Sequence, residues 1–185
     1  MKILVYLGKA LFLTVLTLSP PAFAQASTDA GFATALSQFN RARQGDSGQI
    51  EPAIAAFQVA PATPQYQAVY AAYLGSAKTL KGKAAWMPWN KMKFTEQGLD
   101  HIDQALASLR PEHDRVLIQG VPVGMTTRLV AAATFVAVPD GLFHRRAAGK
   151  SLLAELHRSP MLATMPEAFR AELAAVGAQL KEAEK

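Results

Sequence analysis

The residues of this sequence whose types could support catalysis do not occur at the spacing that a known reaction requires. Gly149, Lys150 and Ser151 are the last three residue types of a phosphate-binding loop. That loop needs a glycine five residues earlier, where this sequence has His144, and it must follow a β-strand. We therefore do not predict nucleotide binding.

Metal and acid–base sites are not indicated either. The four histidines form no His-Glu-x-x-His motif, and the chain has no cysteine. Asp100 and Asp103 lie three residues apart on one helix face, which is typical of solvated carboxylates. No Gly-x-Ser-x-Gly segment marks a serine nucleophile. We predict no catalytic residue, no metal ion and no cofactor, with an enzyme of no recognised motif as an alternative.

Positive charge at the start of two predicted helices is the first feature that points to binding. Pro88 and Pro139 each precede such a helix, and basic residues follow both prolines. Cations there oppose the helix dipole, which favours carboxylates in the first turn. Right-handed stacking of helical hairpins would bring both groups to one edge. We predict that the following residues bind an anion or a partner: Lys91, Lys93, His144, Arg145 and Arg146. The alternative is that they are solvated or paired with Glu96 and Glu112.

Aromatic residues are the second such feature. Trp86 and Trp89 flank Pro88, and Tyr70 and Tyr73 lie on one face of the preceding helix. Large aromatic side chains anchor partners at many interfaces. We predict that these four residues contact a partner. The alternative is that the two Trp rings fill the gap where proline interrupts the helix.

Apolar residues recur at helical spacing through almost the whole chain. They alternate at intervals of four and three, which is the period of an amphipathic helix. Proline and glycine interrupt this pattern seven times, which predicts about eight helices joined by short turns. No useful length of sequence alternates with the period of two that a strand requires. The predicted fold class is all-α, built from antiparallel helical hairpins.

A repeated pattern connects these hairpins. On the second helix of each, a small residue is followed four positions later by a large apolar residue, and a further apolar residue follows three positions after that. The small residue lets two helices approach, and the apolar residue fills the groove between them. We therefore predict that the hairpins stack as a short α-solenoid. The three sets are Ala53, Phe57 and Ala60; Gly98, Ile102 and Ala105; and Gly149, Leu153 and Leu156.

This pattern resembles the tetratricopeptide repeat superfamily, in which a small residue, an aromatic residue and an alanine lie on the second helix and a proline follows. A proline follows each set here, at Pro64, Pro111 and Pro160. The resemblance covers residues 29–160, although the sets are 45 and 51 residues apart instead of about 34. It implies a protein or peptide partner bound on a concave face.

A second resemblance is to uncharacterised secreted bacterial proteins. Residues 88–93 form a Pro-Trp-x-Lys-x-Lys segment, and a Gly-Leu-x-x-Ile-Asp helix follows at residues 98–103. No activity comes with that likeness.

Residues 1–24 have the features of a secretory signal peptide. Lys2 and Lys9 lie in a short basic start, the stretch that follows is apolar, and Ala22 and Ala24 suit signal peptidase. The apolar stretch is shorter than the roughly 20 residues that a membrane-spanning helix needs, which disfavours an uncleaved anchor. We therefore predict an exported protein, periplasmic or secreted.

Cleavage is predicted after Ala24, or alternatively after Ala26, which leaves a single domain over residues 25–185. Loss of Lys2 and Lys9 lowers the formal net charge from +5 to +3. So small a charge on an exported protein gives no indication of nucleic-acid binding. An anionic membrane surface stays a candidate partner.

The sequence therefore predicts a binding or scaffold module for a protein or peptide. The alternative is a binder of an anionic small molecule or lipid headgroup at the basic residues. A ligand binder would enclose a pocket lined by Tyr70, Tyr73 and Trp86, whereas a scaffold would present an open apolar groove.

Overall fold

Eight α-helices and one short β-hairpin make up the described part of the protein. The computed structural model describes residues 22–61 and 63–185, with side chains from residue 30 onward. The predicted all-α class and the predicted number of helices are confirmed for these residues. The signal-peptide prediction depends mainly on residues 1–21, which lie outside the described part.

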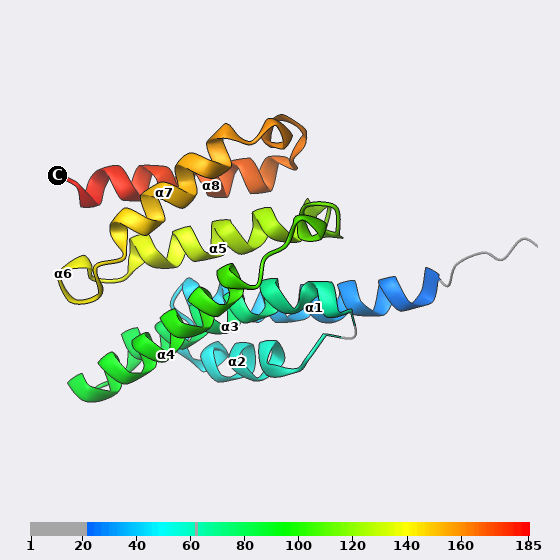
Figure 1. Ribbon diagram of the computed structural model, residues 1–185. Coiled ribbons are helices and arrows are strands. Elements are labelled where there is room, and N and C mark those ends of the chain that lie inside the picture. Colours follow the sequence, from blue (N-terminus) through cyan, green and yellow to red (C-terminus); the bar gives the residue numbers. More distant parts are fainter. Residues whose placement is uncertain (1–21, 62) are drawn as a thin grey trace, which may run out of the picture.

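The elements follow one another in the order drawn in Figure 1. None of the described helices is both long and apolar enough to cross a membrane. The α-helices are α1 (Ala22–Arg43), α2 (Ile50–Gln58), α3 (Gln67–Ala84), α4 (Pro88–Ala107), α5 (Val123–Ala137), α6 (Asp140–Phe143), α7 (Arg146–Arg158) and α8 (Glu167–Ala183). The 3-10 helices are η1 (Ser47–Gln49), η2 (Pro64–Tyr66), η3 (Pro111–Asp114) and η4 (Pro160–Thr164), and the strands are β1 (Leu117–Ile118) and β2 (Val121–Pro122).

Successive helices pack in pairs, and each pair contacts the next. α1 packs on α2, α3 on α4, and α5 on α7, while α3 also contacts α2 and α5. Figure 1 shows α1, α3 and α5 running in the same direction, with the short α6 placed before α7. α8 packs against α5 and α7. It also reaches α1, because Nη2 of Arg43 donates to Oε2 of Glu172 at 3.2 Å.

The repeated small and apolar positions lie inside the molecule, with one exception. The third position is wrong for the first repeat, because Ala60 is exposed and lies beyond the end of α2 at Gln58. The prolines and the short turn there end the helix before it reaches this residue. The buried members of the pattern are Ala53, Phe57, Gly98, Ile102, Ala105, Gly149, Leu153 and Leu156.

Glycine brings the backbones of α3 and α4 together. A Cβ atom at Gly98 would lie 2.5 Å from the carbonyl oxygen of Gly75, and a Cβ atom at Gly75 would lie 2.5 Å from that of Gly98. Nearer the turn, a Cβ atom at Gly82 would lie 2.9 Å from the carbonyl oxygen of Lys91. Because carbon and oxygen cannot approach so closely, the two helices can pack in this way only if these positions lack a side chain. The close-contact role predicted for Gly98 is thus supported by the geometry.

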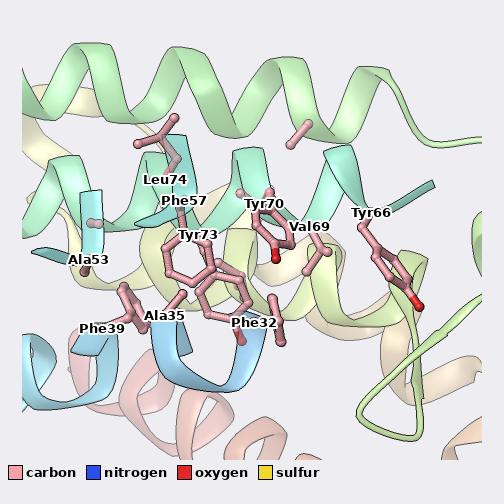
Figure 2. Packing of buried hydrophobic residues seen from close by; sticks show 14 of the residues in the cluster. Phe32, Ala35, Phe39, Ala53, Phe57, Tyr66, Val69, Tyr70, Tyr73 and Leu74 are labelled. Carbon is pink, nitrogen blue, oxygen red and sulfur yellow. The ribbon is translucent and has the colours of Figure 1, made fainter. Parts of the chain in front are cut away.

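An aromatic cluster fills the space between α1, α2 and α3. The ring of Tyr73 stacks on that of Phe57 with 5.0 Å between centroids, and it meets Phe32 edge-on at 5.6 Å. Phe39 also packs edge-on against Tyr73, with 5.2 Å between centroids. Figure 2 shows Phe32 of α1 and Tyr73 of α3 pointing toward one another inside this cluster. The first helical pair is therefore attached to α3 by contacts between aromatic rings.

A β-hairpin occurs where the sequence predicted no strand. Its strands are two residues long, and its turn residues Gln119 and Gly120 have φ angles of 49° and 78°. Positive φ at both central residues is what a tight hairpin turn requires. The hydroxyl of Tyr66 donates to the carbonyl oxygen of Leu117 at 3.1 Å, which ties the hairpin to the segment before α3.

We expect alanine to have opposite effects at two helical glycines. Gly98→Ala should lower the free energy of unfolding by about 1 to 3 kcal/mol, because the new methyl group overpacks the α3–α4 contact. Gly177→Ala on α8 should raise it by about 0.5 to 1 kcal/mol, since nothing lies within 4 Å of the added Cβ atom and alanine favours the helix. Urea denaturation measures both. Equal effects of the two substitutions would contradict the glycine-mediated contact.

Candidate functional site

Two of the predicted aromatic contact residues belong to the core. Tyr70 and Tyr73 are 8% and 9% exposed, and both pack against Phe57. Burial raises the pKa of the Tyr73 hydroxyl well above its ordinary value. The prediction that these tyrosines contact a partner is therefore corrected: α1 and α2 cover the face on which the two rings lie.

The basic residues before α7 are held by carboxylates. The Arg145 guanidinium makes two hydrogen bonds to Asp103 on α4, at 3.1 and 2.6 Å, and lies 5.3 Å from the centre of the Phe135 ring. The backbone N–H of Arg146 donates to Asp140 at 2.8 Å, and the Arg146 side chain lies 4.0 Å from the same carboxylate. Both arginines thus have a role in holding α7 in place.

The predicted binding residues fall into two separate groups. Arg145 lies beside Asp103, which is twelve residues further along α4 than Lys91. Twelve residues correspond to about 18 Å of helix. His144 is exposed at the end of α6, where it has a φ of 52°. The structure therefore does not place the arginines and the α4 lysines around one anion.

Three of the six exposed large apolar side chains among the described residues lie at the turn between α3 and α4. Trp86 is 88% exposed, Trp89 is 65% exposed and Met87 is 39% exposed. Lys83 precedes them on α3, and Lys91 and Lys93 follow on α4, all three of them exposed. We define the hairpin tip as Lys83, Trp86, Met87, Trp89, Lys91 and Lys93.

Local sequence explains why the two Trp rings face solvent. Ala85 and Met87 adopt extended backbone, so α3 ends before Trp86. Pro88 then supplies the fixed φ angle that starts α4, and Trp89 follows in its first turn. The rings do not fill a gap between the helices, which was the alternative prediction for them.

The hairpin tip projects beyond the neighbouring helical pair. The hydroxyl of Thr134 on α5 donates to that of Ser76 on α3 at 2.9 Å, which sets the register of these two helices. From that level α3 continues to Ala84 and α5 only to Ala137, a difference of five residues or about 7 Å. Figure 1 shows the turn at the lower left of the molecule, away from α7 and α8.

The charge around the tip is entirely positive. Every charged side chain between Glu51 and Glu96 is a lysine. Lys81 pairs with Glu51 at 2.6 Å and lies 4.7 Å from the centre of the Phe94 ring. In the part of the chain that the structure describes, no ion pair involves Lys83, Lys91 or Lys93. These three charges are consequently available to a partner.

Sequence reasoning identified the tip only in part. It singled out Trp86, Trp89, Lys91 and Lys93 but missed Lys83, which belongs to the same surface. The long stretch without a carboxylate was the signal that would have added Lys83. A pocket lined by Tyr70, Tyr73 and Trp86 does not form, because the tyrosines are buried while the tryptophan faces solvent.

Two shallow hollows lie elsewhere on the described surface. One lies between the start of α7 and the end of α8, where Lys150 already pairs with Glu184 at 2.8 Å. The other is bordered by Gln67 and His113, and the His113 ring accepts a hydrogen bond from the backbone of Arg110. No cluster of three metal-ligating side chains is found among the described residues.

Comparisons with protein families, with curated proteins and with solved structures found no match for this chain.

The ion pair of Arg145 predicts that the two basic groups respond differently to neutralisation. Arg145→Gln should lower the free energy of unfolding by about 1 kcal/mol, because it removes a partly buried pair and a cation–ring contact. Lys93→Gln should leave stability nearly unchanged, since it removes an exposed cation that forms no ion pair among the described residues. Urea denaturation at low salt measures both, and a larger loss for Lys93→Gln would contradict this assignment.

A contact between His101 of α4 and Lys78 of α3 predicts how stability depends on pH. Nε2 of His101 lies 2.8 Å from Nζ of Lys78, and burial together with this cation lowers the pKa of His101, while Asp100 opposes the shift. The unfolded chain thus binds the proton more readily, so stability should fall as pH drops through about 6.5. His101→Gln should flatten this part of the curve in thermal unfolding. An unchanged pH dependence would show that His101 is not its source.

Proposed function

We propose that this protein is a non-catalytic binding module that contacts its partner through the hairpin tip. The observation that carries the proposal is the exposure of Trp86 and Trp89, at 88% and 65%. Isolated apolar side chains on a surface need no explanation, but here two exposed tryptophans and an exposed methionine lie within four consecutive residues of one turn. Tryptophan is also among the residues that contribute most to binding at protein interfaces.

The arrangement of helices supports a scaffold role. The proposal includes a stack of three hairpins, α1–α2, α3–α4 and α5–α7, similar to tetratricopeptide repeats. Support comes from contacts between successive pairs and from the burial of Ala53, Gly98 and Gly149 at equivalent positions. In such a stack the tip belongs to the middle hairpin, which is held on both sides by its neighbours.

The location and the partner class complete the proposal. An exported, periplasmic or secreted protein follows from the signal-peptide features of residues 1–24. The partner expected from the repeat resemblance is a protein or peptide. The three unpaired lysines of the tip favour a second candidate, an anionic lipid headgroup.

Site-specific crosslinking in the producing cell tests the tip as a contact surface. A photoreactive phenylalanine derivative at position 87 should give an adduct, whereas the same residue at position 175, which is exposed on α8, should not. Trp86→Ala together with Trp89→Ala should abolish the adduct because the apolar anchors are gone. Adducts of equal yield at both positions, or none at position 87, would overturn the proposal.

A further inference from the structure

We propose that the hairpin tip binds the anionic phospholipid surface of a bilayer, with Trp86 and Trp89 at the level of the headgroups and the three lysines on their phosphates. This inference builds on the proposed function and names the partner of the same surface. It follows from the chemistry, the charge and the shape of the tip, each of which is an independent observation.

The chemistry of the tip suits the boundary between water and lipid. Tryptophan collects at that boundary because its ring is apolar while its N–H remains hydrogen-bonded. Trp86 lies in the turn and Trp89 in the first turn of α4, so both rings lie at the same end of the hairpin. Met87 adds a flexible apolar side chain between them. A tip of this kind can enter the headgroup layer without crossing the membrane.

The charge of the tip favours lipid over protein. Protein interfaces are enriched in arginine and depleted in lysine, whereas all the charges here are lysine. An ammonium group is a compact, strongly hydrated charge that is attracted to a diffuse layer of phosphates without a fixed geometry. Lys83, Lys91 and Lys93 make no ion pair within the described residues, so their charges are not neutralised. No carboxylate occurs between Glu51 and Glu96, so every charge in the segment that forms the tip is positive.

The shape of the tip also favours a lipid partner. Neither of the two hollows described above is lined by a tip residue, and the tip itself is a projection. A protein partner would have to offer a matching pocket for it, whereas a bilayer surface adapts to any projection. The close contact at Gly82 and Lys91 keeps α3 and α4 together up to the turn, so the two rings are presented on a rigid support.

Tryptophan fluorescence reports on the tip alone, because Trp86 and Trp89 are the two tryptophans of the chain. Vesicles of phosphatidylcholine with phosphatidylglycerol should shift the emission of the purified protein to shorter wavelength, and lipids brominated on the acyl chain should quench it. Vesicles of phosphatidylcholine alone and inorganic phosphate should do neither. The shift should disappear as salt screens the charges over about 10 Å at 0.1 M.

Matched variants separate the tip from net charge. Lys91→Gln with Lys93→Gln should weaken binding to the anionic vesicles about 25-fold, at about fivefold for each lysine. Arg158→Gln with Lys181→Gln removes the same charge from α7 and α8 and should change binding less than twofold. Trp86→Ala with Trp89→Ala, followed by sedimentation with vesicles, should abolish binding while circular dichroism stays helical.

Each contrary outcome identifies which proposal fails. If anionic vesicles neither bind nor shift the emission, while position 87 still crosslinks to a protein, the lipid inference is overturned and the tip remains the contact surface. Suppose instead that vesicles bind, but the emission does not shift and both sets of tip variants bind as tightly as the unaltered protein. The lipid contact then lies elsewhere, and the inference is overturned as well. Absence of any adduct at position 87, with protein or with lipid, would overturn the proposed function whether or not vesicles bind.

Discussion

The close approach of α3 and α4 is the constraint on which the rest of this structure depends. A Cβ atom at either Gly75 or Gly98 would lie 2.5 Å from the carbonyl oxygen of the other glycine, so neither position has room for a methyl group. This contact fixes the antiparallel register of the hairpin, and α3 then serves as the support for α2 on one side and α5 on the other. Because Gly82 maintains the contact near the turn, the tip has a defined position in the molecule.

The two basic groups show how tertiary context decides what a local pattern means. Both follow a proline and both place cations near the start of a helix, so local sequence offers no reason to treat them differently. In the folded protein Asp103 and Asp140 neutralise the arginines before α7, while Lys91 and Lys93 have no such partner among the described residues. The same unfavourable placement of cations is therefore compensated by ion pairs in the α5–α7 hairpin, whereas in the α3–α4 hairpin the cations are left exposed.

Helices, breaks and most of the repeat could be predicted because they depend on residues that are close in sequence. The aromatic stripe containing Tyr73 was also visible, but its spacing shows only that the residues share a face. What covers that face is decided by Phe32 and Phe57 from other helices, and no local pattern reveals it. The pairing of Arg145 with Asp103 likewise joins residues 42 positions apart. The exposure of the two tryptophans could be predicted only by knowing how far α3 extends relative to α5.

The ion pair between Arg43 and Glu172 has a consequence for how the protein unfolds. An open row of helical pairs touches only its neighbours, so its terminal pairs can fray while the middle stays folded. Here α1 and α8 are joined to each other beside the buried Tyr73, so loosening α8 also breaks the ion pair that holds Arg43 of α1. Such a link opposes piecemeal fraying and favours a single cooperative transition. The hairpin tip, in the middle of this arrangement, then keeps its geometry until the whole domain opens.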